Sequence, residues 1–209
     1  MNGHDASHMT DRAQPSSDRT HAWTFFRQWL KNPIKMASIA PSGQQLAQMM
    51  VDELPTGARR VVELGGGTGV FTTALLKHGI APEDLIVVEL NPELHAHLQR
   101  LFPKVHVIQG DARELVRITT ELGYAAHGPV DAIVSGLGML SIPKPIQLQI
   151  MQAAFASLRP GGRFVQFTYG PTVPLAQDVV DALGLDARKG TTAWRNLPPA
   201  TVYVFTQRG

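Results

Sequence analysis

The residues best suited to chemistry in this chain are an acidic side chain and the glycines that follow it at alternate positions. They are Glu63, Gly65, Gly67 and Gly69. Glycines between a strand and a helix let backbone N–H groups approach a ligand without a Cβ in the way. The spacing is not the G-x-G-x-x-G of a dinucleotide site, because Val70 occupies the third position of that motif. The loop predicts a binding site for another ligand, or glycines that only allow a strand and a helix to pack.

Acidic and polar residues also end other apolar runs. Glu89 lies about 20 residues beyond the glycine loop, where a carboxylate can accept hydrogen bonds from both hydroxyls of a ribose. The alternative for Glu89 is a solvated carboxylate at a strand end. Asp111 follows the run at 105–109, where it can cap the next helix. Ser135 ends the run at 130–135 and has a glycine next to it.

Apolar runs alternate with helical patterns along most of the chain. The expected strands are 61–64, 85–90, 105–109, 130–135, 162–168 and, as a closing antiparallel pair, 188–194 and 200–207. Strands that are apolar throughout and separated by helices predict a parallel sheet covered on both faces. Ligands bind such sheets beyond the carboxyl ends of the strands, near the switch point. The glycine loop, Glu89, Asp111 and Ser135 are therefore expected to meet at one site.

Composition limits the class of protein. The chain has 209 residues, 44% of them hydrophobic, which is enough for one sizeable core and excludes disorder of the whole chain. It has no cysteine, which excludes disulfides, thiolate metal sites and cysteine nucleophiles and suits a reducing compartment. The net charge of +2 is compatible with an anionic partner without requiring one. The histidines show no metal-ligand spacing, and no apolar run reaches the roughly 18 residues of a membrane span.

The first part of the chain divides into a polar segment and a helical one. Residues 1–20 are polar, lack periodicity and are expected to form a disordered tail. Residues 22–31 have helical spacing, with tryptophan and phenylalanine on one face and basic residues on the other. Such a helix can lie in a membrane interface or simply pack on its own domain. We therefore divide the chain into the tail, N-terminal helices at 21–55 and a ligand-binding domain at 56–209.

The glycine loop with Glu63 resembles motif I of the class I methyltransferases, which use S-adenosylmethionine. A narrower resemblance, over residues 25–206, is to the bacterial phospholipid N-methyltransferases, which convert phosphatidylethanolamine toward phosphatidylcholine. The segments that carry it are Phe26-x-x-Trp-Leu-x-Asn-Pro33, Ala40-Pro-Ser42, Val62-Glu-Leu-Gly-x-Gly-Thr-Gly-Val-Phe71, Val88-Glu-x-Asn-Pro92, Gly110-Asp-Ala112, Ser135-Gly-Leu137, Phe164-Val-Gln-Phe-Thr-Tyr-Gly170 and Trp194-Arg-Asn-x-Pro-Pro-Ala200. The last two segments are specific to the family, whereas the whole superfamily shares the glycine loop.

The resemblance implies a seven-stranded Rossmann-like class I methyltransferase sheet, mostly parallel with an antiparallel last strand, preceded by an N-terminal helical extension. It also implies S-adenosyl-L-methionine as the cofactor. The implied cofactor-binding residues are Glu63, Gly65, Gly67, Gly69, Glu89, Asp111, Ala112 and Ser135. In this fold class an acid at the place of Asp111 typically reads the amino group of the adenine.

For the reaction, the resemblance implies attack of a lipid amine on the sulfonium methyl group. A lipid amine is mostly protonated at neutral pH, so it must first lose a proton. We expect Tyr169 to orient or deprotonate this amine, the alternative being a buried tyrosine with a satisfied hydroxyl group. We expect the backbone around Ser135 to hold the amine, which makes Tyr169 and Ser135 the candidate catalytic residues. Trp194 is a candidate for a cation–π contact with the product.

The resemblance also implies a partner and a location. The partner is a membrane surface that contains phosphatidylethanolamine and anionic lipid, contacted through residues 22–31. The location is the cytoplasm, peripheral on the inner face of the cytoplasmic membrane. No nucleic acid partner is expected.

Two positions depart from the family pattern: Gly66 stands where proline is frequent, and Gly138 stands where proline is expected. A related group methylates ornithine lipids and provides an alternative assignment. RNA adenine dimethyltransferases share the cofactor motifs, but they carry an Asn/Asp-x-Pro-aromatic turn, which Ser135-Gly-Leu-Gly-Met replaces here. A membrane-binding adaptor built on the same fold would not need to keep the acidic residues of the cofactor site.

Overall fold

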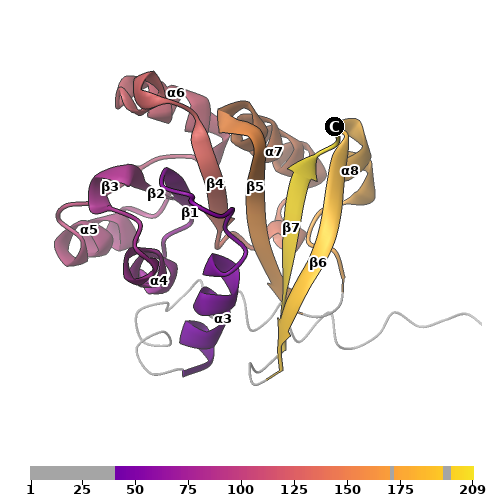
Figure 1. Cartoon of the computed structure of the whole chain (residues 1–209), viewed down its shortest axis with the longest axis horizontal. Coiled ribbons are helices and arrows are strands. Elements are labelled where there is room, and N and C mark those ends of the chain that lie inside the picture. Colours follow the sequence, from indigo (N-terminus) through magenta and orange to yellow (C-terminus); the bar gives the residue numbers. More distant parts are fainter. Residues whose placement is uncertain (1–40, 170–171, 195–198) are drawn as a thin grey trace, which may run out of the picture.

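The fold was obtained as a computed structural model that describes residues 41–169, 172–194 and 199–209. The polar tail expected at 1–20 and the aromatic helix expected at 22–31 lie outside the described residues. The described part has a central sheet with helices packed on both of its faces (Figure 1).

The apolar runs form one seven-stranded sheet in the order β3-β2-β1-β4-β5-β7-β6 (Figure 1). Its strands are β1 (Val61–Leu64), β2 (Leu85–Glu89), β3 (His106–Gln109), β4 (Val130–Ser135), β5 (Leu158–Tyr169), β6 (Leu185–Ala193) and β7 (Ala200–Gln207). Neighbouring strands from β3 to β5 are parallel, and β7 is antiparallel to both β5 and β6. This arrangement, with its antiparallel last strand, confirms the predicted fold class.

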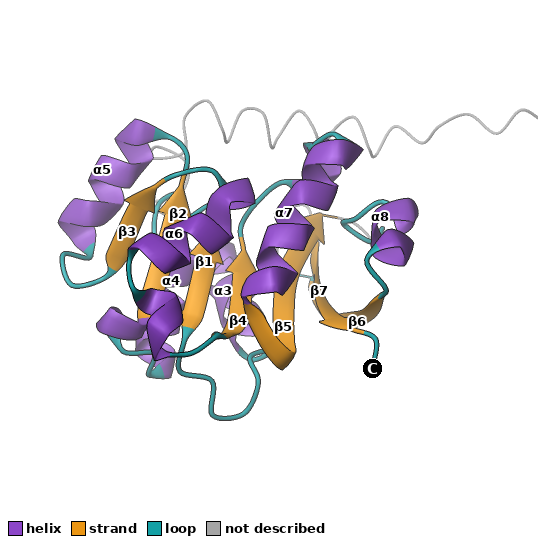
Figure 2. Ribbon diagram, turned by 90° about the horizontal axis from the view of Figure 1, so that it is seen from above, coloured by secondary structure: helices purple, strands orange, loops and turns teal. Residues whose placement is uncertain are grey.

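Helices α3, α4 and α5 cover one face of the sheet, and α6, α7 and α8 cover the other (Figures 1 and 2). Their bounds, with those of the short 3-10 helices, are α3 (Pro41–Val51), α4 (Val70–His78), η1 (Pro82–Asp84), α5 (Pro92–Leu101), η2 (Ala112–Glu114), α6 (Leu115–Glu121), η3 (Tyr124–His127), η4 (Met139–Ser141), α7 (Lys144–Ser157) and α8 (Gln177–Ala182). The chain changes face between β3 and β4. The switch point of the sheet therefore lies between β1 and its neighbour β4.

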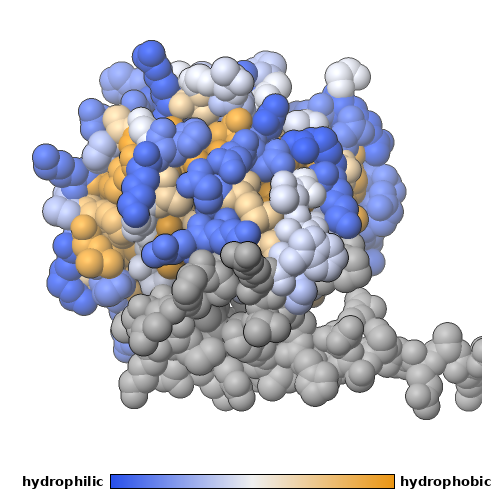
Figure 3. Space-filling model, turned by 60° about the horizontal axis from the view of Figure 1, so that its bottom comes forward, coloured by the Kyte–Doolittle hydropathy of each residue, from blue (hydrophilic) through white to orange (hydrophobic). Residues whose placement is uncertain are grey.

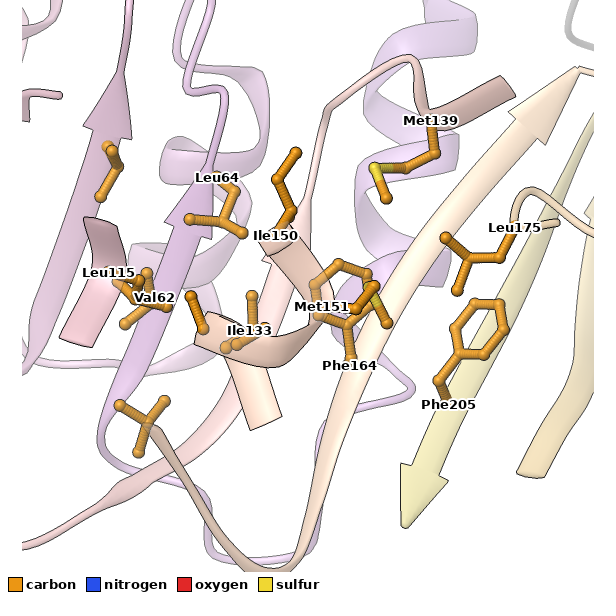
Figure 4. Close-up of a cluster of buried hydrophobic side chains, with 14 of the residues drawn as sticks. Val62, Leu64, Leu115, Ile133, Met139, Ile150, Met151, Phe164, Leu175 and Phe205 are labelled. Atoms are coloured by element: carbon orange, nitrogen blue, oxygen red, sulfur yellow. The ribbon is translucent and has the colours of Figure 1, made fainter. Parts of the chain in front are cut away.

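The larger apolar cluster fills the space between the sheet and helices α6, α7 and α8 (Figure 4). Phe164 of β5 and Phe205 of β7 meet edge to face, with their ring centroids 6.3 Å apart. Met151 of α7 and Ile133 of β4 are also without solvent exposure. Burial of each such side chain is worth about 1.5–3 kcal/mol. This packing fixes the strands in their register and so fixes where their carboxyl ends lie.

Helix α3 belongs to the core on the opposite face of the sheet. Leu46, Met50 and Val51 are buried in the same apolar cluster as residues of β1 and β2. At the start of the helix, a Cβ placed on Gly43 would lie 3.9 Å from Val70, the first residue of α4. The chain therefore enters α3 beside the end of the glycine loop.

Strand β5 begins earlier than the sequence predicts, at Leu158 rather than at residue 162. Its register with β4 shifts, because Val130 pairs with Leu158 whereas Ala132 pairs with Arg163. The residues in between form a bulge that includes Gly161, whose φ is 73°. Proline and glycine are typical of turns, but a bulge in a sheet uses the same residue types.

Candidate cofactor and acceptor site

The carboxyl ends of β1 to β4 meet at one edge of the sheet, and each of them carries a predicted site residue. Gly65 N donates to Val88 O and Gly136 N donates to Leu64 O, both at 2.8 Å. The loops that follow β1 and β4 therefore start side by side at the switch point, where ligands bind in such sheets. The predicted residues brought to this edge are Glu63, Gly65, Gly67, Gly69, Glu89, Asp111, Ala112 and Ser135.

The glycine loop needs its glycines both for backbone conformation and for packing. Gly65, Gly67 and Gly69 have φ values of 75°, 54° and 84°, in the left-handed region that glycine adopts without strain. Gly66 is needed for space, because a Cβ there would lie 2.8 Å from Leu98 Cδ1 and closer still to a valine of β2. The loop leads directly into α4, so its N–H groups and the N-terminus of that helix face the same edge.

Glu89 ties the glycine loop to the end of β2. Its Oε2 accepts a hydrogen bond from Gly67 N, and its Oε1 accepts one from Asn91 N, both at 2.9 Å. The residue is 7% exposed, so it is not the solvated carboxylate of the alternative interpretation. A carboxylate has about four lone-pair sites, and the two bonds to N–H groups occupy half of them. The remaining sites are suited to ribose hydroxyls, and that contact stays a prediction.

Glu63 is buried without a cationic partner among the described residues. It has no solvent exposure, and its Oε2 accepts a hydrogen bond from Thr72 Oγ1 at 2.6 Å. Its Oε1 has no hydrogen-bond partner within the part of the chain that the structure describes. Burial raises the pKa of Glu63 to about 8; the Thr72 hydrogen bond opposes this rise, and the charge of Glu89 adds to it. The unpaired oxygen fits a cationic group, such as the ammonium end of S-adenosylmethionine.

Asp111 caps the short helix η2. Its Oδ1 accepts from Arg113 N at 2.9 Å, and its Oδ2 pairs with Arg113 Nη2 at 2.6 Å. The hydrogen bond from the Arg113 side chain holds the pKa of Asp111 below its usual value, although partial burial opposes the shift. Ala112, the first residue of η2, is half-buried beside it. The capping interpretation is confirmed, and the contact of Asp111 and Ala112 with the adenine stays a prediction.

Ser135 and Gln166 form a buried polar pair under the turn that follows β4. They are register partners in β4 and β5, and neither is exposed. Ser135 Oγ accepts from Leu137 N at 3.3 Å, and Gln166 Nε2 donates to the carbonyl oxygens of Leu137 and Phe167 at 2.8 Å. The Gln166 Oε1 has no partner within the described residues. Gln166 was not predicted as a site residue; the available signal was a polar residue inside an apolar strand.

Tyr169 ends β5 and is half-buried. Its ring meets Phe167 edge to face at 5.4 Å, and Phe167 in turn lies 5.8 Å from Phe71 of α4. Because side chains alternate along a strand, Tyr169 projects from the α4 face while Gln166, with Ser135 beside it, projects from the other. The two candidate catalytic residues therefore reach the same edge from opposite faces. Burial raises the pKa of Tyr169, so its hydroxyl stays protonated at neutral pH.

The residues gathered at this edge fit S-adenosylmethionine. The glycine loop offers N–H groups, Glu89 offers acceptors for ribose hydroxyls, and Glu63 offers an unpaired oxygen for an ammonium group. Among the described residues, no group of three or more histidine or acidic side chains is placed to hold a metal ion. None of the helices in those ranges is long and apolar enough to cross a membrane.

Comparison with known proteins defines the class to which this fold and site belong. A family model described as "Methyltransferase domain" matches residues 61–162, which include the glycine loop and Glu89. An ornithine lipid N-methyltransferase from Singulisphaera acidiphila is 32% identical over 183 residues, or 86% of this chain and 92% of that protein. The chain belongs to the class I S-adenosylmethionine-dependent methyltransferases, and S-adenosylmethionine is its cofactor.

Solved structures of two other methyltransferases share the fold. A TehB-like S-adenosylmethionine-dependent methyltransferase from Corynebacterium glutamicum matches with a TM-score of 0.60 and 18% identity, covering 91% of this chain and all (100%) of that one. The glycopeptide N-methyltransferase MtfA, in complex with S-adenosylmethionine, matches with a TM-score of 0.58 and 13% identity over 79% of this chain and 94% of its own. These similarities confirm the Rossmann-like methyltransferase sheet.

Proposed function

We propose that this methyltransferase transfers methyl groups from S-adenosylmethionine to the primary amine of a membrane lipid. The observation that carries the proposal is the near full-length similarity to a protein named as an ornithine lipid N-methyltransferase. Phosphatidylethanolamine, with its mono- and dimethyl derivatives on the way to phosphatidylcholine, is the acceptor favoured by the sequence motifs. Ornithine lipid is the acceptor favoured by the relative. Phosphatidylethanolamine and ornithine lipid both present a primary amine in the headgroup, so both require the same chemistry for the first methyl transfer.

The chain's own residues have to bind, orient and desolvate the amine. When bound, the cofactor supplies a methyl group activated by the sulfonium charge. Tyr169 stays protonated at neutral pH, so it suits the orienting role better than the role of a base. The turn after β4, held by Ser135 and Gln166, offers backbone carbonyl groups that can accept hydrogen bonds from the amine. Holding the reacting atoms in place in this way can supply a large part of the rate enhancement.

Support for a membrane as the partner comes from apolar side chains exposed at the same edge as the site. Leu90, Leu140 and Trp194 are 66%, 49% and 78% exposed, and they follow the carboxyl ends of β2, β4 and β6. Figure 3 brings the lower side of Figure 1 forward and shows apolar and hydrophilic residues interspersed on it. Exposed apolar side chains around a site can sit at the boundary between headgroups and acyl chains.

The aromatic segment at 22–31 adds to this support. The start of α3, which follows this segment in the sequence, lies beside the glycine loop at the edge that carries the site. We therefore propose that the protein is peripheral on the inner face of the cytoplasmic membrane, with residues 22–31 and the apolar side chains of this edge in contact with lipid.

The substitutions Trp23→Ser and Trp29→Ser test the role of this segment. Both variants should bind vesicles of phosphatidylethanolamine and anionic lipid more weakly in sedimentation assays. Unchanged binding would contradict the role of the segment.

Methyl transfer to lipid vesicles tests the proposal. Labelled S-adenosylmethionine is incubated with vesicles of phosphatidylcholine that contain phosphatidylethanolamine, ornithine lipid or neither, each with and without anionic lipid. We expect label only in vesicles that contain a primary amine lipid, and the labelled product identifies the acceptor. A protein that binds the cofactor but labels neither lipid would contradict the proposal, and RNA would be the next acceptor to test.

Tyr169→Phe tests the orienting role. The ring and its contact with Phe167 are kept, while the hydroxyl is removed. We expect kcat to fall by about tenfold, which is less than the roughly 100- to 10,000-fold contribution of a general acid or base. Cofactor affinity should stay unchanged. Full turnover in this variant would leave Tyr169 as a packing residue only.

A further inference from the structure

Thr72 is a buried polar residue of α4 whose hydroxyl points to the carboxylate of Glu63. We propose that Thr72 is a positioning residue for the charged end of the cofactor. Its hydroxyl binds one oxygen of Glu63 and leaves the other oxygen for the ammonium group of the cofactor. Cofactor binding then displaces a proton from the Glu63 carboxyl group to solvent. The proposal concerns the cofactor alone and does not depend on which acceptor is methylated.

The contact between the two residues is specific. Both are without exposure, and the distance from Thr72 Oγ1 to Glu63 Oε2 is 2.6 Å. A threonine in a helix usually returns its hydroxyl to a backbone carbonyl of the preceding turn, as the neighbouring Thr73 does with Gly69 O at 2.7 Å. Thr72 instead donates across to β1. The first turn of α4 therefore reaches back to the strand that precedes the glycine loop.

The remaining oxygen of Glu63 requires a partner when the group is charged. Oε1 is buried and unpaired within the described residues, and a buried carboxylate without a counter-charge is costly. The nearest acid, Glu89 at the end of β2, adds repulsion. The strand residues beside Glu63, which are Val87 and Val134, bring no charge. An ammonium group placed at Oε1 would supply the counter-charge that the surrounding protein lacks.

The other titratable groups on this face do not replace that counter-charge. Helix α3 contains none. The titratable side chains of α4 and α5 are Lys77, His78, Glu93, His95, His97 and Arg100. Lys77 and His78 are exposed at the far end of α4. Because the neighbourhood of Glu63 is apolar apart from Thr72 and Glu89, its protonation depends on its burial, on these two residues and on the ligand.

The direction of the proton exchange follows from these contacts. Burial raises the pKa of Glu63 to about 8, so the empty site holds a proton on this group at pH 6.5. A bound ammonium group favours the carboxylate, so the O–H bond breaks, the proton goes to the buffer and the ammonium keeps its own protons. Cofactor affinity should therefore rise with pH below 8, by about tenfold per unit at most.

Calorimetry on the full chain measures this exchange directly. S-adenosylhomocysteine is the probe, because it carries the amino-acid end without reacting, and 5′-methylthioadenosine is the matched probe that lacks this end. Titration at pH 6.5 in buffers of different ionisation enthalpy gives the protons released. We expect release of about one proton with the first probe and none with the second. Equal proton release with both probes, or none with either, would overturn the proposal.

Substitutions separate positioning from structural support. Thr72→Val keeps the shape and removes the donor, and affinity for S-adenosylhomocysteine should fall about 10- to 100-fold, as expected for a lost hydrogen bond to a charged group. Its affinity for 5′-methylthioadenosine should not change, and Thr72→Ser should restore the wild-type values.

Thr119→Val is the control, since Thr119 is a buried threonine of α6 whose hydroxyl donates to Val116 O. An equal loss for both probes in Thr72→Val would mean that Thr72 only supports the helix. If that variant fails to fold, the proton release of the wild type and of Thr72→Ser decides.

Discussion

Asp131 at one edge of the sheet, and Glu63 and Glu89 at the other, accept hydrogen bonds from different kinds of donors. Asp111, also at the second edge, pairs with Arg113 and in this respect resembles Asp131. At the edge where the strands begin, Asp131 accepts from the N–H groups of Arg59 and Arg60 and pairs with Arg159 Nε at 2.6 Å. Burial alone would raise the pKa of Asp131, but these donors together hold it below its usual value. At the edge where the strands end, Glu63 and Glu89 have only uncharged donors among the described residues.

This difference distinguishes Asp131, whose contacts stabilise the fold, from Glu63 and Glu89, which retain the capacity to bind a ligand. The half-buried Asp131 finds its counter-charge within the protein, so its contacts stabilise the fold. A buried acid whose donors are only hydroxyl and amide groups gains a counter-charge or further donors only when a ligand binds. The apolar pattern alone does not distinguish Asp131 from Glu63, because both stand in β-strands. The glycines that follow Glu63, and the partners of the two acids, do.

The largest expected effect is on stability, from Asp131→Ala. The substitution leaves the Arg159 side chain and two backbone N–H groups without their acceptor. We expect the free energy of unfolding to fall by about 3 kcal/mol, at about 1 kcal/mol for each of the three donors that lose their acceptor. Urea denaturation measures it. Cofactor affinity of the folded protein should not change, and a loss of affinity comparable to that of a site variant would break the distinction between Asp131 and the pair Glu63 and Glu89.

Glu89→Gln should have the next largest effect, and it should act on the cofactor. The amide keeps the size of the side chain but loses the charge that binds Gly67 N and the capacity to accept from hydroxyls at both oxygens. We expect cofactor affinity to fall by about 2 kcal/mol, or roughly 30-fold, measured by calorimetry. Asp84→Asn, at the opposite end of β2, is the matched control and should leave affinity intact.

Glu63→Gln should change the pH dependence of stability. The folded pKa of Glu63 is raised from 4.5 to about 8, so between these values the folded state holds a proton that the unfolded state has lost. Stability of the wild type should therefore be full below pH 4.5 and decrease as pH rises toward 8, by about 1.4 kcal/mol per unit at most. The variant should lack this slope, as judged from urea denaturation at pH 5, 6.5 and 8. Parallel pH profiles for the two proteins would contradict a buried titrating Glu63.

The smallest expected effect concerns the turn after β4. Gly138 stands where the sequence resemblance leads us to expect proline. Its φ of −75° is one that proline can adopt. Gly138→Pro should raise the free energy of unfolding by about 0.5 kcal/mol, because it restricts the unfolded chain. Thermal unfolding measures the change. A destabilised variant would show that the turn needs the freedom of glycine beside the acceptor.

The sequence predicts the positions of the acids better than it predicts what they contact. Apolar runs and glycine turns are local signals, so they place Glu63, Glu89 and Asp111 at strand ends correctly. The Glu89–Gly67 bond joins residues 22 positions apart in the chain, and it depends on the register of two strands. The pairing of Gln166 with Ser135 depends in the same way on a bulge at the start of β5. Such contacts follow from tertiary packing and have no local signature.

Position 66 has a further consequence for how this protein differs from its relatives. A Cβ at Gly66 would collide with Val87 Cγ1 and Leu98 Cδ1, which pack directly against the loop. A proline at position 66, the residue frequent in the phospholipid N-methyltransferases that the sequence resembles, fits this backbone only if the side chains at 87 and 98 become smaller or move. Residues 66, 87 and 98 should therefore vary together among related proteins. Gly66→Pro alone should destabilise the protein, and smaller residues at both 87 and 98 should be needed to restore its stability.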